Sequence, residues 1–497
     1  MGVLDYVNTD VFMPVYQNGL PDIRSSSINA ICSELYFAIK ANEEIFIYGD
    51  YDMDGFNCNL VWEEVLSTLY DVRPIHFQYS TRQHTVDRDI LQQVRRTSAR
   101  VVIICDSGSG AEDRRVINTL IAQGYTPIVI DHHVYVGDYE QDRMVFKMYN
   151  SFEEIGLLGG AEVSGAYASL LVANHLCKHY FHRSLSFNAM VYALGSMYSD
   201  VVDMSSAPGR ALYNVVASTK LPGPGLMIAL NRWNYAYTRR FFSYIVGPKI
   251  NACFRTENFQ ILNRAMSTRD KYVLNGLAED FQEVHSFARK VVDHLTPQFK
   301  RERYGDTVLA VHIATEETLK LHVRNFSGLI ANKIAKEEKC LAVVVIRIDN
   351  TYSGSFRDFY NRKLLDTFRV FCAADGHDQA FGLTFHDLGD FRRHLALLSK
   401  QLEASVQDDC IVLSGSLVKT EDDVCALALY NEYMNVQPGV RITHRCPKAR
   451  LLQSKAYRKF YDVGLPMQVQ STSPLVEGSN ILVEPCMIGE VELRCVD

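Results

Sequence analysis

Three patterns that would place a chain in a common functional class are missing here. The 12 cysteines form no CxxC pair, which argues against a zinc ribbon or a thioredoxin-like redox motif. No apolar stretch approaches the ~18 residues that cross a bilayer, and the first residues, MGVLDYVNTD, lack the basic start and apolar core of a signal peptide. We therefore expect a cytoplasmic protein that does not enter a membrane and whose cysteines are reduced thiols.

An excess of positive charge is also missing. The formal net charge is -7 at pH 7, whereas a protein that binds nucleic acid is usually basic. This count includes any carboxylates that hold metal ions, however, and bound divalent cations reverse the sign of the local charge. The net charge therefore argues only mildly against a nucleic-acid substrate.

Short hydrophobic runs alternate with amphipathic stretches between about residues 43 and 131. This alternation predicts strands at residues 45–48, 74–79, 101–105 and 127–130, with helices at residues 59–70 and 111–123. Such an order is typical of a mostly parallel sheet that is covered on both faces. Ligands of these sheets bind beyond the carboxyl ends of the strands.

The rest of the sequence predicts further domains. A chain of 497 residues is too long for a single hydrophobic core, so that more than one domain is expected. Residues 160–200 and 205–300 have helical periodicity, broken by LPGPG at 221–225. A second α/β segment has strands at 307–313 and 341–348 and helices at 326–338 and 395–402, and short strands follow residue 410. We predict an α/β protein with a parallel-sheet domain at 1–204, a helical connector at 205–300, a smaller α/β domain at 301–405 and a mostly β domain at 406–497, for which we consider an OB-like fold.

Three aspartates follow the first buried strand, in the stretch IFIYGDYDMDG at residues 45–55. Alternate residues at a strand end point to the same side, so that Asp50, Asp52 and Asp54 are expected to converge. Like charges repel at short range, and bound cations remove this conflict. The spacing also resembles the start of an EF-hand loop, but Val61 stands where that loop needs a glutamate.

Acidic residues end two further predicted strands and one predicted helix. Asp106 follows VVIIC, the sequence DHH at 131–133 follows PIVI, and Asp200 and Asp203 follow ALGSMYS. Carboxylates with an imidazole suit Mn²⁺ or Mg²⁺. Two such ions ~3.5–4 Å apart activate a water molecule and stabilise the leaving oxygen in phosphodiester hydrolysis. We expect Asp106 to bridge the ions, His132 to bind a metal, His133 to contact the phosphate and Asp131 to orient a histidine.

The order DxDxDG, aspartate after a strand, DHH and a further aspartate resembles the DHH phosphoesterase superfamily, and more narrowly the RecJ single-strand exonucleases. GPKINACFRT at 247–256 is similar to the PRINAAGR stretch of RecJ proteins, and residues 326–346 resemble the start of their DHH-associated domain. SGSFRDF at 353–359 and ADGHDQAFG at 374–382 are similar to that domain's GSGRS and GGHxxAAG motifs. The resemblance covers roughly residues 40–390.

The resemblance implies a set of site residues. It makes residues 1–204 a DHH domain and residues 301–405 a DHH-associated substrate-binding domain. The implied metal ligands are Asp50, Asp52, Asp54, Asp106, His132 and Asp200, with Asp131 and His133 catalytic. The implied substrate-binding residues are Asn251, Arg255, Ser353, Gly354, Ser355, Arg357, Gly376 and His377. We expect residues 353–355 to form a loop that offers backbone N–H groups to a phosphate, while Asn251 and Arg255 either touch the substrate or hold the connector.

The chain departs from the family pattern at three positions in two of these motifs. Asp375 stands where RecJ proteins have glycine, Phe356 replaces the middle glycine of GSGRS, and Asp358 follows Arg357 where serine is usual. These changes leave the predicted metal ligands intact. They bear instead on substrate specificity, on the direction of degradation and on the rate of hydrolysis.

The resemblance implies a 5′ to 3′ exonuclease on single-stranded nucleic acid, with DNA favoured over RNA and with replication or repair proteins as candidate partners, and it places the protein in DNA repair and recombination. Two alternatives stay open: a phosphodiesterase for short oligonucleotides or cyclic dinucleotides, and a non-catalytic scaffold in a replication or repair assembly. Aromatic and basic residues near residue 457 are either a platform for stacked bases or ordinary core aromatics with a solvated edge. They are Tyr457, Phe460, Tyr461, Lys455, Arg458 and Lys459.

Overall fold

The chain divides into two compact units in the computed structural model: Met1–Asn251, Phe259–Ala278 and Cys410–Asp497 in the first, and Ala252–Asn258 and Glu279–Asp409 in the second. The structure describes residues 19–80, 82, 86–219, 221–231, 237–360, 362–377, 380–402, 411–433, 440–446, 450–455, 458–463, 465–471, 475, 479–487 and 491–495. The side chains of residues 375, 377, 411–412, 433, 440, 445, 453–455, 458–460, 487 and 491–492 lie outside this description.

A five-stranded parallel sheet forms the centre of the first unit, in the order β2-β1-β3-β4-β5. Its strands are β1 (Ile45–Gly49), β2 (Ile75–His76), β3 (Val101–Cys105), β4 (Thr126–Asp131) and β5 (Lys147–Asn150). Every residue of β1 and β3 is buried, as expected for a parallel sheet covered on both faces. The predicted parallel sheet is therefore confirmed, with β5 as a strand that the sequence pattern did not predict.

The order of the strands places the predicted site at a topological switch point. The chain runs from β1 outward to β2 and then returns to β3 on the other side of β1. The register pairs Gly49 with Cys105 and Cys105 with Ile130, so that three strands end side by side. In open α/β sheets the crevice for a ligand lies at this point, beyond the carboxyl ends of the strands.

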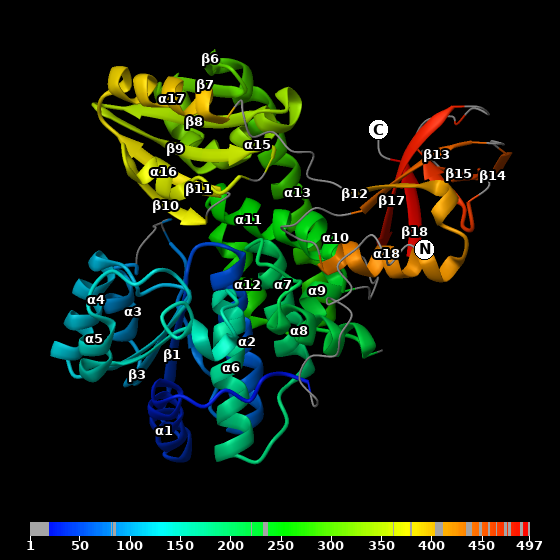
Figure 1. Ribbon diagram of the computed structural model, residues 1–497. Helices are drawn as coiled ribbons and strands as arrows, with labels where there is room; N and C mark the ends of the chain where they lie inside the picture. The colour runs from blue at the N-terminus through cyan, green and yellow to red at the C-terminus, as the bar shows by residue number, and fades with distance from the viewer. Residues whose placement is uncertain are drawn as a thin grey trace. The chain divides into compact units, whose positions relative to one another are not determined.

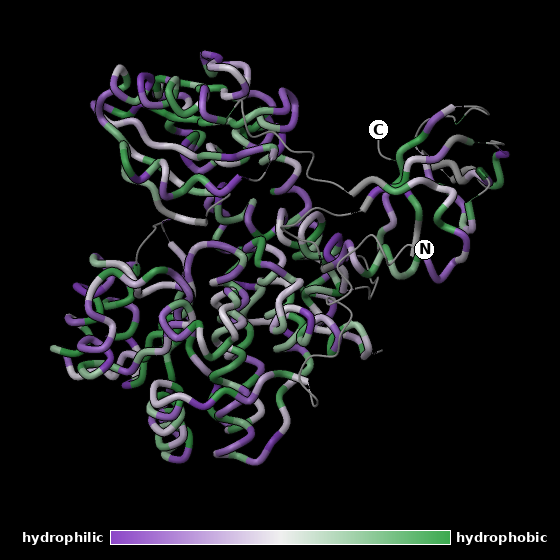
Figure 2. The backbone as a smooth tube through the Cα atoms, viewed as in Figure 1, coloured by the Kyte–Doolittle hydropathy of each residue, from purple (hydrophilic) through white to green (hydrophobic). Residues whose placement is uncertain are grey.

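Helices cover both faces of this sheet (Figure 1). One face carries α3 (Ile90–Val94), α4 (Ala111–Ala122) and α5 (Tyr139–Val145). The other carries α1 (Ser26–Lys40), α2 (Met53–Leu69) and α6 (Gly165–His175), with α7 (Phe187–Ser199) beside α2. Hydrophilic and hydrophobic residues alternate along the outer helices (Figure 2), as in helices that bury one side only.

The segment after α7 is helical, as predicted. It contains α8 (Ala207–Ser218), α9 (Gly225–Leu230), α10 (Arg239–Phe241), α11 (Gly247–Arg255), α12 (Phe259–Ser267) and α13 (Lys271–Leu295). The break at LPGPG lies between α8 and α9, where Pro224 precedes the first residue of α9. Because this segment contributes to both compact units, the four domain boundaries drawn from the sequence stay a prediction.

The second unit contains a six-stranded mixed sheet in the order β10-β11-β9-β8-β7-β6. The strands are β6 (Lys300–Tyr304), β7 (Thr307–Ile313), β8 (Leu341–Ile348), β9 (Thr351–Asp358), β10 (Ala373–His377) and β11 (Ala380–Phe385). Alternate residues of β8 enter two hydrophobic cores: Val344 packs with α13 and α15 (Ser327–Glu338), and Val343 packs with α16 (Leu365–Arg369) and α17 (Leu388–Leu402). This unit is therefore a three-layered α/β structure.

The C-terminal part of the first unit is rich in sheet, in agreement with the prediction. Its seven strands follow the order β12-β13-β17-β18-β16-β15-β14. They are β12 (Ile411–Ser414), β13 (Val440–Arg445), β14 (Arg450–Lys455), β15 (Arg458–Asp462), β16 (Val469–Ser471), β17 (Asn480–Met487) and β18 (Val491–Cys495). The sequence did not predict α18 (Glu421–Tyr433), which buries Val424, Leu427 and Ala428.

Three local predictions are wrong. The strand expected at residues 74–79 is reduced to the two residues of β2. The helix expected at residue 59 begins at Met53, because the Asp52 carboxylate caps it. Residues 353–355 form part of β9, which pairs with β8 on one side and β11 on the other, so that they are no phosphate-binding loop. Among the described residues no helix is both long and apolar enough for a transmembrane span.

Candidate metal centre

The three aspartates after β1 converge through a turn and a helix start, not along a strand. Asp50 follows β1, and Asp52 is the N-cap of α2, where its Oδ1 accepts hydrogen bonds from the backbone N–H groups of Asp54 (2.8 Å) and Gly55 (3.1 Å). A Cβ at Gly55 would lie 2.2 Å from the backbone nitrogen of Asp50. This close approach requires glycine and holds the turn against the start of α2.

Asp54 is bound by the start of another helix. Its Oδ2 accepts a hydrogen bond from the N–H of Gly165 (2.6 Å) and its Oδ1 accepts one from the N–H of Ala166 (2.9 Å). These are the first N–H groups of α6, which have no partner within the helix and carry its positive partial charge. Only 1% of Asp54 is exposed. Asp54 therefore connects the start of α2 to the start of α6.

Asp106 occupies an uncommon backbone conformation directly after β3. Its φ is 57°, in the left-handed region that few residues other than glycine, asparagine and aspartate adopt. Gly165 packs against it, since a Cβ there would lie 2.8 Å from Asp106 Oδ1. Val201, next to Asp200, also has a positive φ, of 56°. Strained residues of this kind cluster at functional sites.

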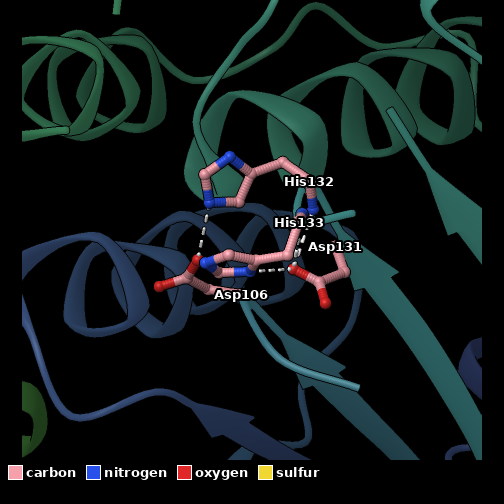
Figure 3. A group of neighbouring side chains, drawn as sticks. All are labelled: Asp106, Asp131, His132 and His133. Carbon is pink, nitrogen blue, oxygen red and sulfur yellow. Dashed lines mark hydrogen bonds and ion pairs between the residues drawn. The ribbon is translucent and has the colours of Figure 1, made fainter. Parts of the chain in front are cut away.

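His132 lies at the centre of the cluster. Its Nε2 is 3.1 Å from Asp106 Oδ1, 3.5 Å from Asp200 Oδ2 and 3.7 Å from Asp54 Oδ2. Figure 3 shows its ring directed at Asp106, while the ring of His133 is directed at Asp131. Burial lowers the pKa of His132 to about 3. The imidazole is therefore neutral, as a metal ligand must be.

Asp131 holds the DHH segment in place. Its Oδ1 accepts hydrogen bonds from the His132 N–H (2.7 Å) and from His133 Nδ1 (2.8 Å), and its Oδ2 accepts one from the Ser109 N–H (3.0 Å). Burial opposes the charged form of His133, but the charge of Asp131 and this hydrogen bond outweigh it and raise the pKa of His133 to about 10. His133 is therefore a cation with 46% of its side chain exposed, beside the carboxylate cluster.

The electrostatics of the carboxylates fit divalent cations. Burial raises the pKa of Asp106 and Asp200 well above the usual range, and the neighbouring aspartates raise it further. Burial and Asp52 raise the pKa of Asp50 to about 8. Within the described part of the chain, the buried atoms Asp50 Oδ1 and Asp200 Oδ2 have no hydrogen-bond partner. Buried anionic oxygens without donors are costly unless a cation neutralises them.

The structure thus brings together the sequence-predicted set around His132: Asp50, Asp52, Asp54, Asp106 and Asp200 act on one another electrostatically, and His132 contacts three of them. The other candidate after α7, Asp203, is not part of this cluster. Its Oδ1 accepts from the N–H (2.9 Å) and the hydroxyl (2.6 Å) of Ser205 in a turn before α8.

Asn251, in the helical segment, supports the candidate metal-binding turn. Its Oδ1 accepts a hydrogen bond from the N–H of Met53, at 2.9 Å. This contact stabilises the first turn of α2, which carries Asp52 and Asp54. Arg255, at the end of α11, belongs to the second unit, where its carbonyl accepts from Asn325 Nδ2 (3.2 Å).

A group of polar residues surrounds the start of α15 in the second unit. Arg357 and Ser355 project from β9, and the Ser355 hydroxyl lies 2.8 Å from that of Ser327, the first residue of α15. A Cβ at Gly328 would lie 3.0 Å from an Arg357 guanidinium nitrogen. Burial lowers the pKa of Arg357 to about 10. A helix start, a guanidinium and two hydroxyls form a suitable site for a phosphate.

Two of the three departures from the family motifs, Phe356 and Asp358, have structural explanations. Phe356 is fully buried and stacks on Phe381, with ring centroids 4.2 Å apart. Asp358 pairs with Arg362 through both carboxylate oxygens, at 2.8 and 2.9 Å. Gly354 is required for packing, because a Cβ there would lie 1.8 Å from the Val344 carbonyl oxygen. Phe356 therefore serves the core and Asp358 an ion pair, while Gly354, which agrees with the motif, serves the sheet.

Several of the predicted substrate residues cannot be placed by their side chains. Gly376 is exposed in β10 with a φ of 131°, which requires glycine, whereas the side chain of His377 lies outside the described residues. The same holds for Tyr457 and for the side chains of Lys455, Arg458, Lys459 and Phe460. Tyr461 is only 5% exposed, as a core residue is.

The sequence did not indicate several residues that support the candidate metal centre through hydrogen bonds or charge. The backbone of Gly165 and Ala166 binds Asp54, and Asn150 Nδ2 donates to Ser109 Oγ and to the His133 carbonyl, both at 2.8 Å. The positive charge of Arg82 counters the effect of burial on the pKa of Asp50 and Asp52. The Ser-Gly pair at 164–165 was the available signal, since serine is a favoured N-cap.

Comparisons with known proteins agree with this geometry. Residues 44–187 match the model of the DHH family, N-terminal domain. RecJ in complex with Mn²⁺ from Thermus thermophilus is 15% identical over 98% of this chain and 73% of its own, with a TM-score of 0.68. RecJ in complex with Mg²⁺ from the same organism is 15% identical over 99% of this chain and 72% of its own, with a TM-score of 0.60.

A third structure, the exonuclease RecJ bound to manganese, is 16% identical over 78% of this chain and 97% of its own, with a TM-score of 0.56. No curated protein matches the chain. Residues 44–187 are thus a DHH-family N-terminal domain. The chain as a whole has a RecJ-like fold. Together with the cluster around His132, this fold supports a metal-dependent phosphoesterase.

Proposed function

We propose that the chain hydrolyses phosphodiester bonds in single-stranded nucleic acid with two divalent cations, Mn²⁺ or Mg²⁺. One observation carries this proposal. Five aspartates and one neutral histidine, from segments between residues 50 and 200, converge at the switch point of the parallel sheet, and two of their buried oxygens have no hydrogen-bond donor among the described residues. Bound cations supply the missing positive charge and activate the attacking water.

The surroundings of each residue in the cluster indicate its role. Asp50, Asp52, Asp54, Asp106, His132 and Asp200 would hold the ions, and the charges of the other four aspartates all act on Asp106. His133, cationic and half-exposed, contacts the scissile phosphate. Asp131 positions His133 through its Oδ1. A preorganised positive group at the reacting phosphate stabilises the charge that develops in the transition state.

The second unit supplies a phosphate-binding site. Arg357 forms no ion pair among the described residues, and it lies at the start of α15 beside Ser355 and Gly328. We assign this group to a phosphate of the bound strand, with Gly376 and His377 as further contacts. The likeness to RecJ leads us to propose 5′ to 3′ degradation, with DNA favoured over RNA and with replication or repair proteins as partners. We also propose a cytoplasmic location.

The test is a time course on end-labelled single- and double-stranded DNA and RNA with Mn²⁺, Mg²⁺ or a chelator. We expect mononucleotides to leave from the 5′ end of single-stranded DNA, and no hydrolysis with the chelator. Asp52→Ala, Asp106→Ala and His132→Ala should each abolish hydrolysis, whereas His294→Ala, at a histidine 57% exposed on α13, should not. Faster cleavage of a dinucleotide than of a long strand would favour the small-substrate alternative, and unchanged biological activity of Asp106→Ala would leave only a scaffold.

A further inference from the structure

A second group of metal-ligand side chains lies at the opposite end of α6 from the carboxylate cluster. His175 is the last residue of α6, and His179 follows in the π-helical turn η4 (Leu176–Tyr180). Asp22 faces them from the chain before α1. One ligand atom from each of these three residues lies within 4.8 Å of the others. Single π-helical turns are frequent at functional sites.

Both ring nitrogens of His175 have an oxygen neighbour at hydrogen-bond distance. Nδ1 is 3.1 Å from the Ile23 carbonyl oxygen, and Nε2 is 2.8 Å from Asn29 Oδ1. His175 is 5% exposed, and burial lowers its pKa, so that the ring is neutral and has a single N–H. When Nδ1–H donates to the Ile23 carbonyl, Nε2 carries a lone pair, which can bind a metal ion or accept a hydrogen bond from the rotated Asn29 amide.

His179 and Asp22 complete the arrangement. His179 Nε2 lies 2.8 Å from Asp22 Oδ1, and Lys178 Nζ donates to the other oxygen, Asp22 Oδ2, at 2.7 Å. The simpler interpretation is a surface ion-pair cluster, since Lys178 is 54% exposed and such pairs contribute little to stability. That interpretation accounts for Asp22, Lys178 and His179, but it leaves out the buried ring of His175, whose centroid lies 4.4 Å from that of His179.

We propose that Asp22 Oδ1, His175 Nε2 and His179 Nε2 bind a divalent transition-metal ion such as Zn²⁺, with Asn29 Oδ1 as a further ligand. Metal–ligand bonds of ~2.0–2.1 Å place neighbouring ligand atoms ~2.9–3.4 Å apart, close to the 2.8 Å separations in this group. The Ile23 carbonyl and Lys178 then orient the first ligands, as outer partners do in metal sites.

The ligand chemistry separates this site from the catalytic cluster. Two imidazoles and one carboxylate favour Zn²⁺, Ni²⁺ or Co²⁺, whereas an oxygen-rich cluster with one imidazole favours Mg²⁺ and Mn²⁺. The ion ties the segment before α1 to the end of α6, whose first N–H groups bind Asp54. Its role is therefore to fix a helix that supports the catalytic centre. The site does not depend on the proposed hydrolysis.

The test is zinc binding by the full-length chain after removal of metals, with excess Mg²⁺ present to fill the catalytic cluster. We expect one Zn²⁺ per chain by calorimetry and by elemental analysis, and a zinc-dependent rise in melting temperature. His179→Ala and Asp22→Asn should each weaken this binding by more than the ~10–100-fold that loss of an outer partner costs. His294→Ala, at an exposed histidine of the second unit, should bind zinc as the unmodified chain does.

Cobalt gives a second readout that does not depend on folding stability. Co²⁺ bound by the unmodified chain should show ligand-field absorption bands that Asp22→Asn and His179→Ala lack. Equal zinc affinity in the unmodified chain and in His179→Ala would overturn the proposal, and so would an unmodified chain that binds no zinc once Mg²⁺ fills the cluster. Nuclease activity does not enter either result, so that the outcome is separate from that of the proposed function.

Discussion

Replacement of Asp54 by alanine tests whether this carboxylate holds two helices together as well as a metal. The change removes the acceptor for the N–H groups of Gly165 and Ala166, at 2.6 and 2.9 Å, in a place where Asp54 is 1% exposed. Each buried N–H left without a partner costs ~1–3 kcal/mol, so that the two together cost about 2–6 kcal/mol. Loss of one negative charge from the cluster offsets part of this cost in chelator.

The matched control is Asp200→Ala. It also removes one charge from the cluster, but its Oδ2 accepts no hydrogen bond among the described residues. Urea unfolding in chelator should therefore show Asp54→Ala less stable than the unmodified chain by a few kcal/mol, and Asp200→Ala equally stable or more stable. With Mg²⁺ present, the deficit of Asp54→Ala should grow, because the ions have already neutralised the repulsion. Equal stability of the two variants in chelator would refute the role of Asp54 at α6.

Two further predictions concern residues outside the ligand set. Burial raises the pKa of Glu432 to about 7, although its Oε2 accepts a hydrogen bond from the Arg239 N–H (2.7 Å). Between about pH 4.5 and 7 the folded state therefore binds more protons than the unfolded state. The free energy of unfolding falls by on the order of 3 kcal/mol as pH rises through this window. Glu432→Gln should remove this fall, so that it gains stability over the unmodified chain at pH 8 but not at pH 4, in urea unfolding; an equal gain at both pH values contradicts the assignment. Asn251→Ala should weaken metal binding ~10–100-fold, because the contact to the Met53 N–H is lost. Asn251→Asp keeps an acceptor oxygen and should bind metal as the unmodified chain does. Weaker binding of DNA with unchanged metal affinity would make Asn251 a substrate contact instead.

The parallel sheet and its acidic edge could be predicted because local patterns determine both. Val101–Cys105 is a run of five buried residues, and its ends agree with the prediction. Strands in a parallel sheet end at the same edge, so that topology alone brings together Asp106, directly after β3, and Asp131, the last residue of β4. His132 follows from the same argument.

Contacts between distant segments could not be predicted in this way. Nothing near Asp54 indicates that it binds the start of α6, because its partners lie more than 100 residues away in the chain. The small residues at 353–355 favoured a loop, yet they pair with strands on both sides. Gly354 is required because a side chain there would collide with the Val344 carbonyl, a contact that the sequence does not reveal. The apolar pattern of α18 is short and lies between strand-like segments, so that no helix was predicted there.

The matched family domain ends at residue 187, where α7 has just begun, and Asp200 caps the far end of that helix. A fragment cut at this boundary would keep the whole parallel sheet and His132, but it would lose an oxygen 3.5 Å from the His132 ring nitrogen. Tyr198, two residues before Asp200, touches Glu432 of α18. Shortening this chain to its matched domain would therefore remove both a proposed metal ligand and the contact that links α7 to α18.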